Sequence, residues 1–458
     1  MKIRFYLLVF SVLALAHESE AQISFSAQLR TRTEFRNGQG TPLPEDASPA
    51  FFTSQRTRLN AGYSGYRFKI YTSLQDVRVW GQDASSINRI TSDPYDGLML
   101  HEAWGEFSLV DTGRVIKDLS LKIGRQELVY DDVRLLGNLD WLQQARRHDA
   151  ALLKFEHAGW VAHLGVAYNQ NGERKSGTVY NGVPTGYPAS TNNMSANYKS
   201  LQFLYVARKF PFGTASFLAL KDDFSRYSFA PTDTLKTTPV YSDDVWSRYT
   251  TGLNLFGSAG KKITFGLSAF YQGGTYREGT KLNEYFASAS FLYAATPGLL
   301  LGPGVDFTSG NNGADPTKRY QRFDPLYGTP HKFWGYMDYF YVADAFGPNG
   351  LVDYYLKTKF KIKENLMIMT DMHRFVLPEA IPSEGGEDLD KALGTEIDLV
   401  ASYGLTKVIG IEGGFSTMFS TATMTATKVK NIPDANDIST WAYLMVSIKP
   451  EMLSGNKK

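Results

Sequence analysis

The sequence predicts an all-β protein, a transmembrane antiparallel β-barrel of about 18 strands with short periplasmic turns and long extracellular loops. Three observations support this prediction: an export signal at the N-terminus, segments with apolar residues at every second position, and connections that are alternately long and short. Together they indicate an exported chain that is built from two-faced strands and has both termini in the periplasm.

The chain begins with a segment typical of a secretory signal peptide. Two basic residues, Lys2 and Arg4, precede an apolar run over residues 5–16 and a small-residue cleavage site. The run is shorter than the roughly 20 residues that a membrane-spanning helix needs. Residues 1–21 are therefore predicted to be a signal peptide, and residues 22–458 a single barrel domain.

Composition excludes several classes of protein. The chain has 48 Lys and Arg against 46 Asp and Glu, a net charge of +2, and the mature chain keeps this value because the signal peptide contains two residues of each sign. This balance argues against a nucleic-acid partner. The chain has no cysteine, which excludes disulfides and thiolate metal sites. Aromatic residues make up 14%, which suits a large secreted all-β protein or an outer-membrane barrel.

Residues 23–36, ISFSAQLRTRTEFR, show the two-faced pattern. Side chains on a β-strand point alternately to opposite faces. One face of this segment is mostly apolar, and the other carries Arg30, Arg32 and Glu34. The pattern recurs along the chain. The predicted strands are 23–36, 52–63, 66–80, 101–110, 119–127, 147–157, 159–169, 199–209, 212–223, 246–257, 262–272, 284–294, 297–309, 350–361, 364–375, 393–403, 408–419 and 439–448.

The connections between these strands are alternately long and short. NGQGTPLPEDASPA is one of the long segments, whereas ATPG and GLTK are short. Outer-membrane barrels follow this rule, and a soluble sandwich has no reason to. A further strand candidate at 331–343 would break the alternation. We therefore assign it to one long loop, residues 310–349, which is extracellular or folded into the pore.

The arginine-bearing face of the strands is predicted to line a water-filled lumen. A cation that faces lipid at the membrane mid-plane costs about 2–4 kcal/mol. Arginine presents a planar fork that matches a carboxylate, and rings of Arg or Lys make pores anion-selective. The candidate pore and substrate-binding residues are Arg30, Arg32, Arg56, Arg58, Arg78, Arg125, Arg134, Arg146 and Arg147, with Glu34, Asp76, Asp131, Asp132 and Asp149 as their acidic partners. The alternative is that these charges only brace the wall through cross-strand ion pairs.

Several stretches resemble the alginate export family of outer-membrane porins. The resemblance is carried by KIGRQELVYDDVRLLGNLDWLQQARRHDAALLKF (122–155), LQDVRVWGQ (74–82), GVDFTSGNN (304–312), FDPLYGTPHKFWGYMDYF (323–340) and GTEIDLVASYGL (394–405). It implies a monomeric 18-stranded barrel in the bacterial outer membrane, with an arginine-lined constriction that favours anionic polysaccharides. The polar tail EMLSGNKK after the last strand departs from the family pattern.

Other chemistry finds weaker support in the sequence. His101-Glu102 and His148-Asp149 could suggest general bases, but neighbours on a strand point to opposite faces and cannot share a site. Asp131-Asp132 is a weak cation candidate. We expect no catalytic residues, no metal and no cofactor.

A channel for anionic saccharides or other acidic solutes is favoured over a general porin or structural barrel, and both over an outer-membrane enzyme. Its expected partners are membrane lipid, these solutes, and periplasmic export or assembly proteins.

Overall fold

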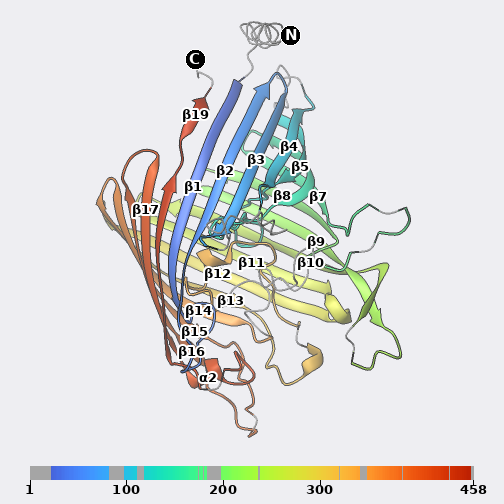
Figure 1. Ribbon diagram of the computed structural model, residues 1–458, viewed down its shortest axis with the longest axis vertical. Coiled ribbons are helices and arrows are strands. Elements are labelled where there is room, and N and C mark those ends of the chain that lie inside the picture. Colours follow the sequence, from blue (N-terminus) through green and yellow to red (C-terminus); the bar gives the residue numbers. More distant parts are fainter. Residues whose placement is uncertain are drawn as a thin grey trace.

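A computed structural model gives the arrangement of most of the chain (Figure 1). It describes residues 22–81, 97–110, 118–173, 175–178, 180–182, 197–235, 238–318, 320–340, 348–383, 385–432 and 434–454. The predicted signal peptide, residues 1–21, lies outside the described residues. None of the helices in the described part is long and apolar enough to cross a membrane.

The strands form a closed antiparallel barrel. Each strand from β1 to β18 pairs with its neighbours in the sequence, and β1 also pairs with β18, with Leu29 opposite Ile448 and Asn37 opposite Thr440. All eighteen predicted strands are present, so the predicted fold class is confirmed. Closure satisfies the backbone hydrogen bonds of both edges, which a sheet inside lipid requires.

The elements are named as in Figure 1. Their bounds are β1 (Gln22–Asn37), β2 (Ala50–Gly65), β3 (Phe68–Val79), β4 (Met99–Ser108), β5 (Asp118–Gln126), β6 (His148–His157), β7 (Trp160–Tyr168), β8 (Ser200–Phe210), β9 (Gly213–Phe229), β10 (Pro239–Ala259), β11 (Ile263–Thr275), η3 (Arg277–Gly279), β12 (Lys281–Thr296), β13 (Leu299–Thr308), η4 (Pro316–Lys318), η5 (Pro330–Lys332), β14 (Leu351–Lys363), β15 (Leu366–Val376), β16 (Ala392–Gly404), β17 (Ile409–Ser420), α2 (Ala422–Thr425), β18 (Ile438–Ile448) and β19 (Glu451–Ser454).

Alternation along each strand separates a lipid face from an inner face. On β10 and β11 the outward Leu253 and Leu267 are 61% and 38% exposed, whereas the inward Thr250 and Gln272 are fully buried. Apolar side chains that would be anomalous on a soluble surface meet hydrocarbon here. The inner side chains are buried because loops enter the barrel.

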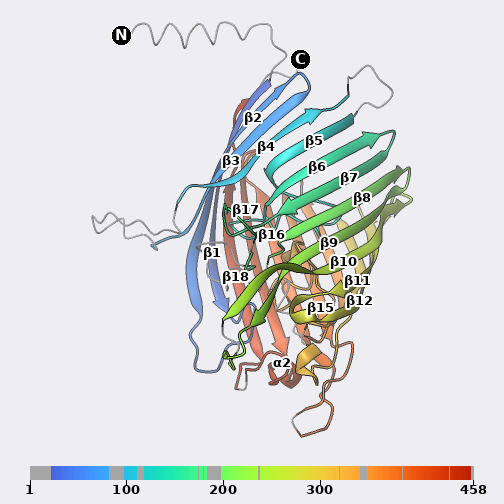
Figure 2. The same ribbon diagram turned by 90° about the vertical axis from the view of Figure 1, so that its right-hand side faces the viewer.

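The C-terminal tail differs from the expectation. Residues 451–454 continue the wall as β19, which pairs with the beginning of β1 and places Ser454 opposite Ser24. Pro450 separates β18 from β19, since proline cannot donate a hydrogen bond to the ladder. Its carbonyl still accepts from the Ala27 N–H at 3.1 Å, so the wall remains paired. The start of β1 and the end of β19 lie at the same end of the barrel, beside the short β2–β3 turn (Figures 1 and 2).

Two long loops fold into the barrel. The loop of residues 127–147 joins β5 to β6, and the loop of residues 309–350 joins β13 to β14. They pair with each other, since the Tyr327 N–H donates to Leu135 O at 3.0 Å and the Thr329 N–H donates to Val133 O at 2.8 Å. The predicted absence of a strand at 331–343 holds for residues 331–340, and residues 341–343 lie outside the described residues. The loops and the wall enclose an apolar cluster that includes Leu136 and Tyr327.

The two ends of the barrel should differ in access to a large thiol reagent. Gly313 lies in the 309–350 loop, and Asn365 lies in the short turn between β14 and β15. We expect Gly313→Cys to react with an impermeant polymer-linked maleimide on intact cells. Asn365→Cys should react only after the envelope is permeabilised. The reverse pattern would mean that the barrel is inserted the other way round.

Candidate functional site

Four arginines project inward from β1 and β2 and form one cluster. Arg30 and Arg32 lie on β1, and Arg56 and Arg58 lie on β2, with Arg30 directly opposite Arg56. Arg30, Arg32 and Arg56 are at most 5% exposed. Like charges about 4 Å apart repel by roughly 4 kcal/mol at an effective dielectric constant near 20. The cluster therefore requires anionic or carbonyl oxygen atoms around it.

Asp140 of the 127–147 loop supplies the shared counter-charge. Its carboxylate lies 2.8 Å from Arg56 Nη2 and 3.3 Å from Arg30 Nη1. Arg58 Nη1 is 3.7 Å from the same carboxylate. The Asp140 side chain is 44% exposed although the arginines around it are buried. One half-exposed carboxylate thus faces three guanidiniums.

Backbone carbonyls of the loop complete the solvation of the arginines. Arg30 Nη2 donates to the carbonyl oxygens of Trp141 and Leu142 at 3.2 and 3.3 Å. Arg32 Nη1 donates to Trp141 O at 2.8 Å. The arginines of β1 therefore hold the 127–147 loop against the wall through its backbone carbonyls.

Glu34 is the second acidic partner of the cluster. Its carboxylate accepts from Arg32 Nε at 2.8 Å and from Arg36 Nη2 at 2.8 Å, and the Trp441 indole N–H donates to it at 3.1 Å. Glu34 is 1% exposed. With each oxygen held by an arginine, Glu34 orients the cluster.

Two arginine N–H groups in the cluster have no protein acceptor. Arg56 Nε and Arg58 Nη2 are buried without a hydrogen-bond partner. A buried donor left unpaired costs about 1–3 kcal/mol. An anion or a water molecule at this position would remove that cost.

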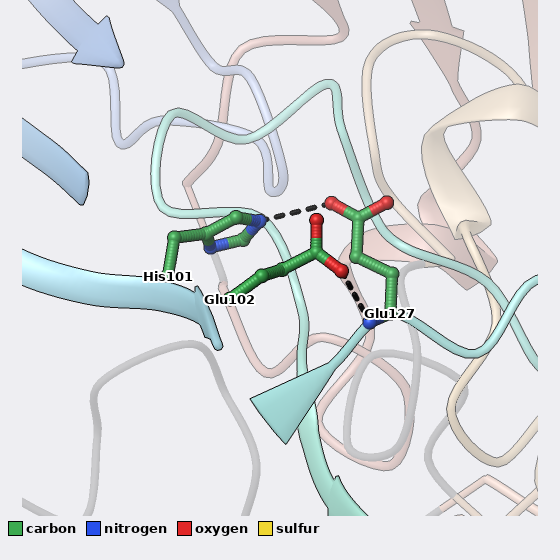
Figure 3. Close-up of side chains that lie close together, drawn as sticks. All are labelled: His101, Glu102 and Glu127. Atoms are coloured by element: carbon green, nitrogen blue, oxygen red, sulfur yellow. Dashed lines mark hydrogen bonds and ion pairs between the residues drawn. The ribbon is translucent and has the colours of Figure 1, made fainter. Parts of the chain in front are cut away.

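His101, Glu102 and Glu127 come together beside the cluster (Figure 3). His101 Nε2 lies 2.9 Å from Glu127 Oε1, and the Glu127 N–H donates to Glu102 Oε1 at 3.2 Å. The prediction that His101 and Glu102 point apart is wrong, because a register shift in the β3–β4 pairing interrupts the alternation at this point.

The same three side chains are a candidate metal site, since their ligand atoms lie within 4.8 Å of one another. Their oxygens already accept from protein donors. Glu127 Oε2 accepts from the Asn138 side chain at 2.8 Å, and Glu102 Oε1 accepts from the Trp104 indole at 3.2 Å. Arg58 lies 3.9 Å from Glu127. The arrangement therefore favours an anchor between β4 and the 127–147 loop over a cation site.

The far end of the 127–147 loop binds the opposite wall. Arg134 pairs with Asp306 of β13 at 2.5 Å and with Asp132 at 3.3 Å. Asp131 accepts hydrogen bonds from Tyr205 and Ser216 at 2.9 and 2.8 Å. Asp131 and Asp132 thus have separate partners. Because its other end contacts β1 and β2, the loop crosses the lumen.

The 309–350 loop is held by two further contacts with the wall. Arg248 of β10 is buried between Asp222 and Asp324, at 2.5 and 2.7 Å. The Met337 N–H donates to the buried Glu396 carboxylate at 2.8 Å. Arg248 lies within the predicted strand 246–257 but is not among the predicted pore residues.

Two further predicted arginines, Arg146 and Arg147, lie at the end of the 127–147 loop, just before β6 begins. Arg146 is 9% exposed and donates to the carbonyl of Gly328 in the other loop. Arg147 Nη2 approaches Met99 Sδ at 3.6 Å. Arg146 therefore joins the two loops.

Two predicted pairs lie on the outer face of the barrel. Asp76 and Arg78 pair at 2.8 Å on the side of β3 that carries exposed Phe68 and Ile70. Ser73 and Gln75 on the other side of β3 are buried and face inward, so the predicted assignment of Asp76 and Arg78 to the lumen is corrected.

Arg125 and Asp149 also pair at 2.8 Å, and both are partly exposed. They alternate with the buried, inward-facing Gln126 and His148. Their side chains therefore face outward and do not line the lumen. His148 accepts or donates a hydrogen bond with Tyr198 at 2.7 Å, so His148 and Asp149 do not share a site, as expected.

A row of lysines lines the inner wall near the short-turn end, and the sequence analysis missed it. Lys357, Lys359, Lys361 and Lys363 share the face of β14 that carries buried Asp353. Lys357 pairs with Asp371 at 3.0 Å and Lys361 with Glu364 at 2.8 Å. Among the described carboxylates, none pairs with Lys359 or Lys363. The repeat KTKFKIK is the signal that could have revealed this row.

Three of these lysines border an open cavity of about 620 Å³, which also contacts Lys449. Pro297, Asn365 and Gly404 also line it, so it opens at the short-turn end. This vestibule carries an excess of cationic side chains.

The family model described as alginate export matches residues 21–436 of the chain. Solved structures with the same fold include OccAB4 from Acinetobacter baumannii, with 10% identity, a TM-score of 0.60, and coverage of 95% of this chain and 100% of that one. OccK3 (OpdO) from Pseudomonas aeruginosa has 14% identity, a TM-score of 0.58, and coverage of 95% and 96%. OccK9 (OpdG) from the same organism has 14% identity, a TM-score of 0.57, and coverage of 94% and 99%. The search of curated proteins found no match.

Removal of the shared counter-charge should loosen the 127–147 loop. Asp140→Asn leaves three guanidiniums facing a neutral amide, so we expect a channel with noisier current and a stronger preference for anions in planar bilayers. Asp149→Asn is the matched control, because it also removes an arginine-paired carboxylate, but from the outer face. Equal effects of the two variants would contradict the assignment of Asp140 to the lumen.

The same contact should respond to acid. Burial raises the pKa of Asp140, but the guanidiniums of Arg56 and Arg30 lower it by more, so the pKa lies below the usual carboxyl value. A carboxylate with a lowered pKa stabilises the folded state above its ordinary pKa and loses this effect as the pH falls through the lowered value. We expect steady conductance from about pH 7 to 5 and increased gating noise only below about pH 4. Noise that rises already near pH 6 would assign the anchor to another group.

Proposed function

Because this chain belongs to the alginate export family of the bacterial outer membrane, we propose that it is a channel for anionic saccharide polymers or other acidic solutes that carry carboxylates. The observation that supports this most is the inward arginine cluster, which binds the oxygens of Asp140, Trp141 and Leu142. These oxygens are hydrogen-bond acceptors, as the carboxylate oxygens of an acidic solute would be.

A polymer with one carboxylate per sugar would bind by exchange with the loop. Each guanidinium released from a loop carbonyl can donate two hydrogen bonds to one carboxylate, and this contact is stronger than its contact with a neutral oxygen. The unpaired donors of Arg56 and Arg58 give an anion its first point of attachment. In this mechanism the 127–147 loop is a gate that a suitable anion displaces.

The lysine row gives the anion a path to the cluster. Lys359 and Lys363 line the short-turn vestibule, and the ammonium of Lys332 in the 309–350 loop donates to Asp132 O at 3.0 Å. Lysine ammoniums on flexible stems attract anions without a fixed geometry. Weak binding at several sites allows a charged solute to move on.

A second reading is a general porin or structural barrel without polymer selectivity. The observation in its favour is that the two inward loops bury residues such as Met337 and Tyr339 completely. A barrel filled in this way would pass ions only when its loops move. Bilayer recording separates the two readings.

The test is the reversal potential of single channels in a KCl gradient. We expect the unmodified channel to prefer anions, less so at high salt because the Debye length shrinks. The double variant Arg58→Gln with Lys359→Gln should shift the reversal potential toward cation preference. Arg125→Gln is the matched control, since it removes an arginine from the outer face and should leave selectivity unchanged.

Substrate class is tested in the same recordings. Uronate oligomers should block the unmodified channel, and the double variant should need at least about tenfold more oligomer for the same block, since each lost charged hydrogen bond is worth about 1.5–3 kcal/mol. Neutral oligosaccharides of equal length are the control. A cation-preferring channel, or equal block by charged and neutral oligomers, would disprove the proposal. A barrel that never conducts would support the structural reading.

A further inference from the structure

The lipid-facing wall contains a hollow across β7 to β11. It has a volume of about 690 Å³ and is lined by Trp160, Arg208, Phe210, Ala215, Leu253 and Leu267, among others. Most of the lining residues belong to the outer face of their strands, as the exposed Leu253 and Leu267 do, and the buried Asn254 and Ser268 also border the hollow. The hollow therefore opens toward the membrane.

Small side chains create this hollow. Ala215 of β9 lies between Arg208 of β8 and Leu255 of β10, and Ala269 of β11 lies beside Leu253. Each alanine leaves a gap between larger neighbours, so the wall is recessed at these positions. A recess of this kind offers apolar contacts on several sides to a flexible hydrocarbon chain.

One end of the hollow carries a cation. The Arg208 guanidinium lies 4.8 Å from the Trp160 ring centroid and donates to Ala158 O at 3.3 Å. Among the carboxylates that the structure describes, none forms an ion pair with it. Its remaining N–H groups can therefore bind an anion.

This cation lies at the periplasmic edge of the wall. Trp160 follows the short β6–β7 turn, and Arg208 lies close to the short β8–β9 turn. Phe210 and Phe212 stack at 5.4 Å in that second turn and are 41% and 48% exposed. Exposed aromatic rings at this level mark the membrane interface, where lipid head groups lie.

We propose that the hollow is a binding site for an anionic glycerophospholipid of the periplasmic leaflet. The phosphate binds the free edge of the Arg208 guanidinium, and an acyl chain lies over Ala215 toward Ala269. Charge complementarity at the interface and an apolar recess leading into the hydrocarbon region together match a lipid, which has both parts.

The site is tested by native mass spectrometry of the full-length barrel in detergent, titrated with phosphatidylglycerol or phosphatidylcholine. We expect the unmodified protein to retain phosphatidylglycerol in preference to phosphatidylcholine. Arg208→Gln should lower the affinity for phosphatidylglycerol about tenfold, as for the loss of one charged hydrogen bond. Ala215→Phe should lower the retention of both lipids, because the ring fills the recess.

Two matched variants control for a general change in the lipid face. Arg374→Gln removes an exposed outward arginine of β15, and Ala401→Phe enlarges an exposed outward alanine of β16. Both should bind lipid like the unmodified protein. The proposal is overturned if Ala215→Phe and Ala401→Phe behave alike, or if Arg208→Gln does not reduce the preference for phosphatidylglycerol. It is also overturned if Ala215→Phe converts a dimer to a monomer, which would make the hollow an interface between two copies of the chain.

Discussion

The pairing of β1 with β18 is the constraint on which the rest of the structure depends. It closes the sheet, so every strand has two partners and no edge is exposed to hydrocarbon. Closure also fixes which side of each strand faces inward, because a slip of one residue would exchange the faces. Arg30 therefore faces the lumen and Leu29 faces the lipid. The arginine cluster results from closure of the barrel as well as from the residues that the strands contain.

Within the closed wall, the arginines and the inward loops stabilise each other. A buried guanidinium is costly unless oxygen atoms surround it, and the 127–147 loop supplies them from Asp140 and Trp141. A polar loop would equally be unstable inside a barrel without donors for its carbonyls. The loop is thus bound by the arginines to which the proposed function assigns solute binding. Under that proposal, gating and selectivity depend on the same contacts.

The sequence predicted the strands well because their signal is local. Alternation and turn length identify each strand without reference to distant residues. The face of Arg78 can also be predicted from the sequence, because Arg78 lies at alternate positions with the apolar Phe68 and Ile70 and therefore shares their side of the strand. The approach of His101 to Glu102 depends on a register shift, and the contact of Arg134 with Asp306 depends on a loop that crosses the barrel. Such long-range contacts leave no periodic signal, so only the structure reveals them.

The distribution of the two cation types fits a graded path. Arginine lies at the centre, where a planar fork can hold several oxygens in fixed positions, as Arg30 holds Gln143 and two loop carbonyls. Lysine lies at the vestibule, which Lys359 and Lys363 line, and an ammonium group on a flexible stem imposes no fixed geometry on an anion. A polyanion that enters from the vestibule would contact the lysines first and the arginines later. Weak binding to the lysines would allow it to enter and to dissociate again. The opposite order would place the tightest site at the mouth and slow every later step.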